Sequence, residues 1–154
     1  MHQVCAKAGV DPSQINHIIH GTTLATNALI ERRGAKTALI TTEGFRDVIE
    51  MRTESRFEQY DLNLNLHDPL LPSQMRFTVG GRVDANGAVL VDIDRAEVED
   101  VVDRIAAAGF ESVAVGLIHS YLNPAHEELV RDVLAEKLPD VAVSISSEVS
   151  PQMR

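Results

Sequence analysis

The sequence predicts an α/β fold in which helices flank a mostly parallel sheet and a β-hairpin is inserted. Three observations carry this prediction. Segments typical of strands alternate with segments of helical spacing along most of the chain. Two of the strand segments, KTALITT and SVAVGLI, are almost continuously apolar, as is typical of strands in a parallel sheet. The pair Asn86-Gly87 separates two further strand-like segments and favours a tight hairpin turn, because both residues tolerate positive φ.

The first half of the chain predicts two strand-to-helix connections. A short helix is expected to end at Gly9, and after the turn DPSQ the stretch INHIIH has the β-branched character of a strand. TTLATNALIERR then changes to helical spacing, and Gly34 is expected to end that helix. KTALITT is the next strand, and GFRDVIEM begins a helix for which Thr42 is the candidate N-cap. Residues 52–73 show no lasting period and predict a long loop of the functional or interface-forming kind.

The second half predicts a hairpin followed by two more helices and strands. RFTVGGRVD and AVLVDI are expected to pair as its antiparallel strands. Asp94 is expected to cap the helix RAEVEDVVDRIAAAG, which Gly109 closes, and SVAVGLI then forms a strand covered on both faces. Asn123 and Pro124 open the next helix, with proline at its first position. VAVSIS is a further strand, and no helix is expected in the closing SEVSPQMR.

Composition predicts one folded domain over residues 1–154. The chain is 44% hydrophobic and 24% charged, which is the profile of a globular protein and not of a disordered one. A length of 154 residues suffices to bury a core without disulfides or metals. Cys5 is the only cysteine, which excludes an internal disulfide and a thiolate-cluster metal site.

Charge and hydropathy exclude several classes of partner. The formal net charge is -9 and the sequence pI is near 5.0, so a nucleic acid or an anionic membrane surface would be repelled. The sequence contains no apolar run of the roughly 20 residues that a bilayer requires. MHQVCAKAGVDPSQ lacks an apolar signal core, so a cytoplasmic location is expected.

The first candidate ligand site is His20-Gly21-Thr22-Thr23, which follows a predicted strand and opens a helix. Gly21 lets the backbone turn closely, and the free N–H groups of the first helical turn can hold a phosphate or a carboxylate together with the two hydroxyls. Alternatively, Thr22 or Thr23 only caps its own helix. Asn27 and Glu31 follow Thr23 at four-residue steps, so they either extend the anion site along one helix face or belong to a solvated face.

Two further candidates also lie where a predicted strand ends. Thr42 and Arg46 occupy the turn after KTALITT, and the Arg46 guanidinium suits a ligand carboxylate, although surface ion pairing is its commoner use. His119-Ser120-Tyr121 follows SVAVGLI, with His126 and Glu127 in the next helix. His119 is a candidate general base, with no serine or cysteine nucleophile tied to it by spacing. His17 and His20 point to opposite faces of a regular strand, and no metal site is expected.

The stretch HGTTLATNALIERRGAKTALITTEGFRDVIEMR closely resembles the N-terminal domain of the hydantoinase A/oxoprolinase family. That family includes N-methylhydantoinase A, 5-oxoprolinases and acetone carboxylase β-type subunits. Further matches follow in order: ESRFEQYDLN, LLPSQMRFTVGGRVDANGAVL, SVAVGLIHSYLNPAHE and VSISSEVSPQMR. The resemblance covers nearly the whole chain from about His17 onward, and ordered matches over such a length are more specific than any one motif.

The resemblance implies a ribonuclease-H/actin-like ATPase fold in which ATP and Mg²⁺ activate a hydantoin, 5-oxoproline, a related lactam or a ketone. It implies as partners the remaining hydantoinase A domain and a hydantoinase B-type subunit. Such proteins begin with a glycine-rich DxGGTxTD segment and continue beyond the equivalent of SSEVSPQMR. The chain contains neither part, so it is expected to be truncated at both ends relative to the family, to be inactive alone and to bind no ATP by itself. An exposed sheet edge is then expected to favour self-association.

Three functions compete at this point. The first is part of an ATP-dependent hydrolase of cyclic amides, and the acetone-carboxylase-type subunit is a variant of it. The second is a non-catalytic assembly domain that uses residues 52–73 as its contact surface. The third is a small stand-alone domain that binds a nucleotide or another anion.

Overall fold

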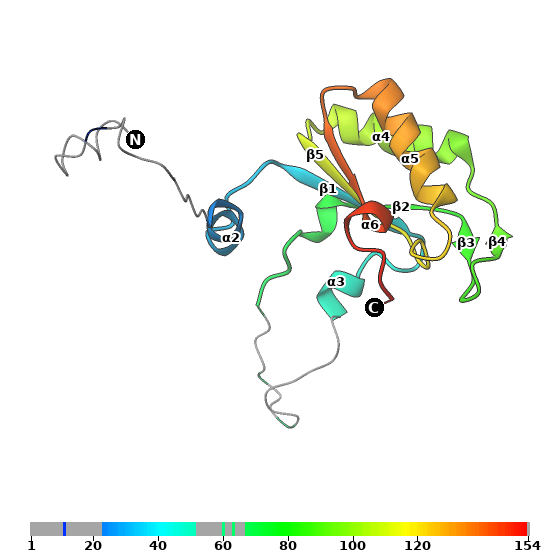
Figure 1. Ribbon diagram of the computed structural model, residues 1–154, viewed down its shortest axis with the longest axis horizontal. Helices are drawn as coiled ribbons and strands as arrows, with labels where there is room; N and C mark the ends of the chain where they lie inside the picture. The colour runs from blue at the N-terminus through cyan, green and yellow to red at the C-terminus, as the bar shows by residue number, and fades with distance from the viewer. Residues whose placement is uncertain (1–10, 12–22, 52–59, 61–62, 64–66, 154) are drawn as a thin grey trace. The chain divides into compact units, whose positions relative to one another are not determined.

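The computed structural model describes Asp11, residues 23–51, Tyr60, Asn63 and residues 67–153. The chain divides into two compact units, Met1–Arg33 and Gly34–Arg154 (Figure 1). The helix predicted before Gly9 and the strand predicted in INHIIH lie outside the described residues, as does most of the predicted loop over residues 52–73.

The described helix of the first unit is α2, Leu24–Ile30, in the segment that the sequence predicts to be helical. The sequence predicts that this helix ends at Gly34, whereas α2 ends at Ile30. Arg32 takes φ 54 and its N–H donates to the Leu29 carbonyl at 3.3 Å. The Arg33 N–H donates to the Ala28 carbonyl at 2.9 Å. These two bonds satisfy carbonyls of the last turn, so arginine occupies the left-handed position that glycine usually takes.

The second unit is built on a four-stranded parallel sheet of order β2-β1-β5-β6. The strands are β1 Thr37–Thr42, β2 Arg76–Val79, β5 Ser112–Gly116 and β6 Ala142–Ile145. The central strand β1 places Ile40 beside Phe77 of β2 and beside Val115 of β5. The predicted fold class, an α/β protein with a mostly parallel sheet, is confirmed.

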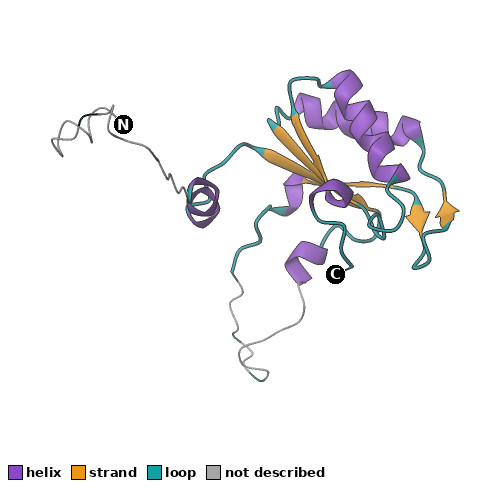
Figure 2. Cartoon of the chain, viewed as in Figure 1, coloured by secondary structure: helices purple, strands orange, loops and turns teal. Residues whose placement is uncertain are grey.

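Two long helices pack side by side over the sheet, α4 Arg95–Ala107 and α5 Ala125–Lys137 (Figure 2). Their apolar faces and alternate strand residues form one core, whose members include Ile40, Val79, Val98, Val102, Ile105, Val113, Val130, Val133 and Leu134. Burial alternates along β5, where Val113 and Val115 are buried and the residues between and beside them are half-buried. Both faces of β5 are thus at least partly covered among the described residues, with the deeper burial on the face of Val113 and Val115.

A short antiparallel hairpin joins β3 Arg82–Val83 to β4 Val89–Val91. The predicted hairpin is confirmed, but its first strand is shorter than expected. The segment RFTV is instead β2 of the parallel sheet, and Gly81, at φ 92, breaks the chain direction between β2 and β3. Because the pairing of β2 with β1 is long-range, local sequence pattern does not reveal it.

The hairpin turn is held by one carboxylate. Asp84 Oδ1 accepts hydrogen bonds from the N–H groups of Asn86 and Ala88, both at 2.8 Å. Gly87 takes φ 84, whereas Asn86 does not take a positive φ, contrary to the two-residue turn expected from the sequence. The Gly87 N–H donates to the Asp84 carbonyl at 3.1 Å, which is the pattern of a longer turn closed by a left-handed glycine.

The predicted caps of α4 and α5 agree with the structure with one change. Asp94 accepts from the Ala96 N–H at 3.0 Å, and Gly109 follows the helix at φ 66. At α5 the Asn123 side chain accepts from the Ala125 N–H at 3.2 Å. The sequence predicts Pro124 as the first helical residue of α5, whereas in the structure Pro124 is the N-cap.

Three short helices complete the second unit: α3 Val48–Met51, the 3-10 helix η2 Ser73–Met75 and α6 Ser146–Val149. The sequence predicts α3, although it begins later than expected. α6 corrects the expectation that SEVSPQMR contains no helix. Its first turn is held by a side chain from α5, which is distant in sequence and therefore invisible to local pattern.

Candidate functional site

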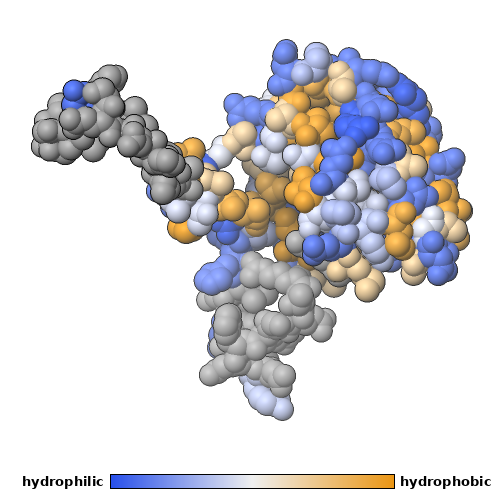
Figure 3. All heavy atoms as spheres, viewed as in Figure 1, coloured by the Kyte–Doolittle hydropathy of each residue, from blue (hydrophilic) through white to orange (hydrophobic). Residues whose placement is uncertain are grey.

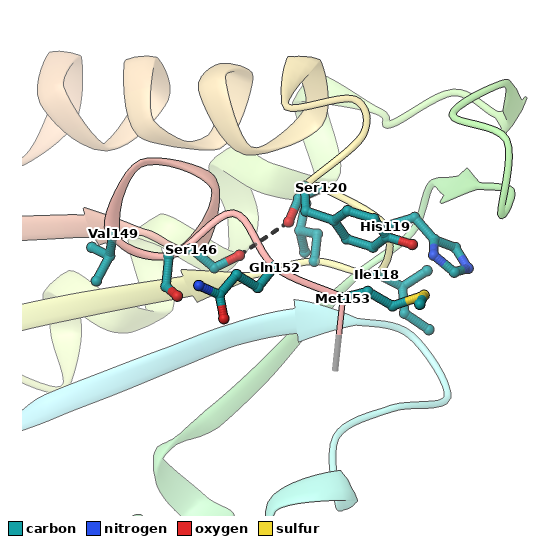
Figure 4. A pocket seen from close by; sticks show the side chains of 10 residues that line it. Ile118, His119, Ser120, Ser146, Val149, Gln152 and Met153 are labelled. Carbon is teal, nitrogen blue, oxygen red and sulfur yellow. Dashed lines mark hydrogen bonds between the residues drawn. The ribbon is translucent and has the colours of Figure 1, made fainter.

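A cavity of about 460 Å³ lies at the carboxyl ends of β5 and β6. This is the edge at which open α/β sheets bind ligands, and the volume is in the range of small-molecule sites. Its walls come from the loop after β5, from α6 and from the segment that follows α6 (Figure 4). The lining residues are Leu117, Ile118, His119, Ser120, Tyr121, Ser146, Val149, Ser150, Gln152 and Met153.

The cavity wall is organised from behind by Glu127, whose side chain is fully buried in the first turn of α5. Its Oε1 accepts from the Leu117 N–H at 2.9 Å and from the Ser146 hydroxyl at 2.7 Å. Its Oε2 accepts from the N–H and the hydroxyl of Ser147, at 2.9 and 2.7 Å. A buried carboxylate is costly unless it is hydrogen-bonded, and here both oxygens are saturated by donors. Glu127 therefore ties the loop after β5 to the start of α6.

Two serine hydroxyls carry this network to the cavity. Ser146 Oγ, which is bound to Glu127, lies 3.0 Å from Ser120 Oγ, and both serines line the cavity (Figure 4). The sequence groups Ser120 and Glu127 with His119 at this candidate place but assigns them no role, and it does not predict Ser146 as a site residue. The available signal was the pair Ser146-Ser147 at the carboxyl end of a predicted strand, because polar residues at this end often face a ligand.

Thr42 is a predicted site residue that the structure assigns a different contact. It is buried at the end of β1, and its hydroxyl accepts from the Ile118 N–H at 3.0 Å. The prediction that Thr42 caps α3 is wrong, because its oxygen faces the neighbouring strand end. Thr42 holds the loop that lines the cavity without lining the cavity itself.

His119 lies in the cavity wall, as the strand-end argument predicts. It is half-buried, takes the left-handed φ of 57, and its ring centroid is 6.0 Å from that of Tyr121. The pKa of the Asp84 carboxyl is lowered mainly by the N–H groups of Ala88 and Asn86, with a smaller contribution from the charge of His119. His119 is thus one of the residues that line the cavity.

Arg46 makes the surface ion pair that is its commoner use. Its Nε lies 3.2 Å from Asp47 Oδ1, and both side chains are about half exposed. The same Asp47 oxygen also accepts from Nη1 of the buried Arg76 at 3.1 Å. Arg46 does not line the cavity.

The predicted anion site is only partly described. His20, Gly21 and Thr22 lie outside the described residues. Thr23 precedes α2 without a capping hydrogen bond from its side chain, and its carbonyl accepts from the Asn27 N–H at 2.8 Å. Thr23 and Asn27 are both exposed. The phosphate-binding role of this segment stays a prediction.

The described residues contain neither a metal-binding group of side chains nor a membrane-spanning helix. No group of three or more His, Cys, Asp or Glu side chains in that part of the chain could hold a metal ion. His126 instead pairs with Asp92, its Nε2 lying 3.3 Å from Oδ1. Among the helices that the structure describes, none is long and apolar enough to cross a membrane.

Comparison with known proteins supplies the family. Residues 1–138 match the family described as the hydantoinase/oxoprolinase N-terminal region. The chain belongs to the hydantoinase/oxoprolinase family. The resemblance inferred from HGTTLATNALIERRGAKTALITTEGFRDVIEMR is thereby confirmed.

The chain is similar to a part of two larger proteins whose names state an activity. It is 32% identical to caprolactamase subunit alpha of Pseudomonas jessenii, over 99% of this chain and 23% of that subunit. It is 30% identical to the 5-oxoprolinase of Saccharomyces cerevisiae, over 94% of this chain and 13% of that protein. The chain thus spans less than a quarter of the length of these hydantoinase/oxoprolinase relatives.

Solved structures of the family show the same fold. The crystal structure of the ATP-dependent caprolactamase from Pseudomonas jessenii matches with a TM-score of 0.85, covering 99% of this chain and 23% of that one. A nucleotide-free structure of acetone carboxylase, from a study of ATP-dependent acetone carboxylation, matches with a TM-score of 0.82 at 25% identity, over 97% and 23% of the two chains. The proteins to which this chain is similar therefore include a caprolactamase, a 5-oxoprolinase and an acetone carboxylase.

Proposed function

We propose that this chain is the N-terminal domain of a longer enzyme that uses ATP to hydrolyse a cyclic amide such as hydantoin, 5-oxoproline or a related lactam. The observation that carries the proposal is the match to caprolactamase along 99% of the chain, with a TM-score of 0.85. The cavity at the carboxyl ends of β5 and β6 supports it, because a ligand site is expected at this edge of the sheet.

ATP and Mg²⁺ are the proposed cofactors of the longer enzyme. The proposed phosphate contacts are the residues of the predicted anion site, His20, Gly21, Thr22, Thr23 and Asn27. The exposed Thr23 and Asn27 suit this role, since Thr23 uses its hydroxyl in no capping bond. Bound ATP would supply the phosphoryl group that activates the amide. Mg²⁺ is commonly held through nucleotide phosphates and a few carboxylates, so a ready-made cluster of protein ligands is not required.

Lactam-dependent release of phosphate from ATP tests this function. The assay uses the longer subunit that contains this chain, together with a hydantoinase B-type subunit as the proposed partner. Hydantoin, 5-oxoproline and ε-caprolactam are supplied one at a time, and at least one is expected to stimulate phosphate release. Stimulation by acetone and bicarbonate alone would instead identify an acetone-carboxylase-type subunit and contradict the hydrolase.

The 154-residue chain by itself is expected to be inactive and to give no measurable heat on titration with ATP and Mg²⁺. This outcome follows if the nucleotide cleft requires segments that other parts of the longer enzyme supply. A saturable binding isotherm for the isolated chain would favour a stand-alone nucleotide-binding domain. The coding sequence on both sides of this segment provides an independent check, since a DxGGTxTD-like segment is expected upstream.

One observation favours a second candidate function, an assembly domain that contacts a hydantoinase B-type subunit. All residues of β4, Val89, Leu90 and Val91, are exposed, and Leu122 is exposed near the hairpin turn. Figure 3 shows hydrophobic atoms at the surface on the side of the molecule that carries the hairpin. Exposed apolar patches of this kind mark protein interfaces. The names of two relatives, caprolactamase subunit alpha and acetophenone carboxylase gamma subunit, describe them as subunits.

Co-elution in size-exclusion chromatography tests the assembly function. The wild-type chain is expected to co-elute with the hydantoinase B-type subunit, and Leu90→Ser is expected to weaken this association. Glu128→Ala, which changes an exposed residue of α5, is the matched control and is expected to co-elute as the wild type does. A chain that elutes alone in every mixture contradicts the assembly function.

A further inference from the structure

Two of the polar groups that line the cavity, the hydroxyls of Ser120 and Ser146, have hydrogens with fixed directions. Ser146 has one hydroxyl hydrogen, and it is donated to Glu127 Oε1 at 2.7 Å. Ser146 Oγ can therefore take part in its 3.0 Å contact with Ser120 Oγ only as the acceptor. It follows that Ser120 donates its own hydrogen to Ser146. Both hydrogens point away from the cavity along the path to Glu127.

This arrangement gives the wall a definite polarity. After donating to Ser146, Ser120 Oγ has lone pairs and no free hydrogen, so it can only accept from a ligand. Serine hydroxyls normally adapt to either role by rotation, but rotation here would leave the fully buried Glu127 short of a donor. Glu127 is thus a positioning residue, because it sets the polarity of a group that it does not touch.

The other lining residues are four apolar side chains and four polar ones, His119, Tyr121, Ser150 and Gln152. Leu117, Ile118, Val149 and Met153 contribute aliphatic surface around the two hydroxyls. Figure 4 shows Ile118 and Met153 on one side of the hydroxyl pair and Val149 on the other. A volume of about 460 Å³ accommodates a single ring compound with its immediate contacts.

We propose that this cavity binds an uncharged ring amide, with the ring against the aliphatic walls and the amide N–H donating to Ser120 Oγ. The oriented lone pairs disfavour a carboxylate or a phosphate at this point, since both are acceptors and carry negative charge. The choice of a lactam as the ring amide rests on the proposed function, whereas the polarity of the wall follows from the hydrogen bonds alone. The residues of this site belong to the second compact unit, and the proposed phosphate contacts belong to the first.

Titration of the 154-residue chain with ε-caprolactam, followed by NMR, tests the proposal without turnover. Saturable shifts are expected at the amides of residues 117–121 and 146–153, with a dissociation constant on the order of 1 mM for so small a ligand. N-methylcaprolactam keeps the ring and the carbonyl but lacks the N–H, and we expect it to bind roughly three- to tenfold more weakly, the effect of one hydrogen bond. Equal affinity of the two compounds would overturn the proposal.

Two variants and one control test the role of the hydroxyls. Ser120→Ala removes the proposed acceptor, so the preference for ε-caprolactam over its N-methyl derivative should fall. Glu127→Gln introduces an amide donor and lets the serine hydrogens reverse, which should reduce the same preference. Ser144→Ala, on the exposed side of β6, is the control and should keep the wild-type preference. Because the preference is a ratio for one folded protein, partial destabilisation does not mimic the effect, and a Ser120→Ala chain that keeps the full preference contradicts the proposal.

Two further probes separate this proposal from the proposed function. Adenosine also carries a ring and N–H donors, and binding of adenosine without binding of ε-caprolactam would overturn the lactam as ligand. Inorganic phosphate is expected to leave the cavity resonances unchanged. If lactam-dependent phosphate release occurs in the longer enzyme but the cavity ignores lactams, only the site is wrong. If the cavity binds the lactam with the stated preference but no lactam stimulates phosphate release, only the proposed function is wrong.

Discussion

Glu127 holds Ser147 at two points, because its Oε2 accepts both the backbone N–H and the hydroxyl of that residue, at 2.9 and 2.7 Å. The other oxygen holds Leu117 and Ser146. Glu127 belongs to α5, whereas its partners follow β5 and β6. One side chain therefore connects three elements at the carboxyl edge of the sheet.

Replacing Glu127 with alanine should lower the free energy of unfolding by about 3–5 kcal/mol, since it leaves several donors without their acceptor in the interior. Urea denaturation followed by circular dichroism measures the change. The neighbouring Glu128 is exposed, so Glu128→Ala should change stability by no more than about 0.5 kcal/mol. Similar small effects for both variants would contradict the structural role assigned to Glu127.

The second prediction concerns the contribution of Arg76 to stability. Its side chain is fully buried, and each of its hydrogen bonds goes to a different partner. Its guanidinium donates to the Leu71 carbonyl at 2.9 Å, to Asp47 at 3.1 Å and to Glu50 at 2.7 Å. Arg76→Met fills the space but removes all three bonds, and we expect a loss of about 2–4 kcal/mol in urea denaturation. Asp47 and Glu50 remain half exposed and can recover water, which limits the loss.

Arg46→Ala is the control for Arg76→Met. Arg46 pairs with the same Asp47 from the surface, and exposed pairs contribute little. The expected change is within about 0.5 kcal/mol. A larger loss for Arg46→Ala than for Arg76→Met would show that the buried arginine does not hold α3 to β2.

The elements that sequence predicts best are those whose signals are local. α4 begins after Asp94 and ends before Gly109, as the sequence predicts. These signals are local because a cap and a left-handed glycine act within a few residues. β1, β5 and β6 were also predicted, since apolar runs of this length and composition seldom form anything else in an α/β pattern. RFTV was assigned to the hairpin because its partner β1 lies far away in sequence.

The candidate site was harder to predict than the fold for the same physical reason. His119 was found because a polar residue after a buried strand indicates a ligand edge. The sequence places Glu127 near His119 but does not predict its role, because a glutamate in a first helical turn is usually solvated and favours the helix dipole without further partners. Only the packing of α5 against β5 and β6 buries it and brings Ser146 and Ser147 to its oxygens.

Two glycines with positive φ provide a matched comparison. Gly44, at φ 84, has nothing within 4 Å of the position of an added Cβ. At Gly81, with φ 92, an added Cβ would lie 3.1 Å from Ile93 Cβ and 3.2 Å from His126 Nδ1. Gly44→Ala should therefore cost only the backbone strain, about 1–2 kcal/mol. Gly81→Ala adds a steric clash and should cost at least about 1 kcal/mol more.

Urea denaturation of both glycine variants checks this ordering. The two substitutions remove the same conformational freedom from the unfolded chain, so the difference between them reports the folded state. If Gly44→Ala lowers the free energy of unfolding more than Gly81→Ala does, the contacts of an added Cβ with Ile93 and His126 do not destabilise the junction between β2 and β3.

Acid titration of the hairpin turn gives the last prediction. The N–H groups of Ala88 and Asn86 hold the pKa of Asp84 below its ordinary value of 3.8. Because the pKa is lowered in the folded state, the ionised carboxylate stabilises the turn at pH values above 3.8. This contribution to stability is lost as the pH falls through the lower folded-state pKa. NMR should therefore show the amide resonances of Asn86 and Ala88 moving with pH in a transition whose midpoint lies below 3.8. Asp84→Asn, which cannot ionise, should remove the transition, and a midpoint above 3.8 in the wild type would contradict the assigned hydrogen bonds.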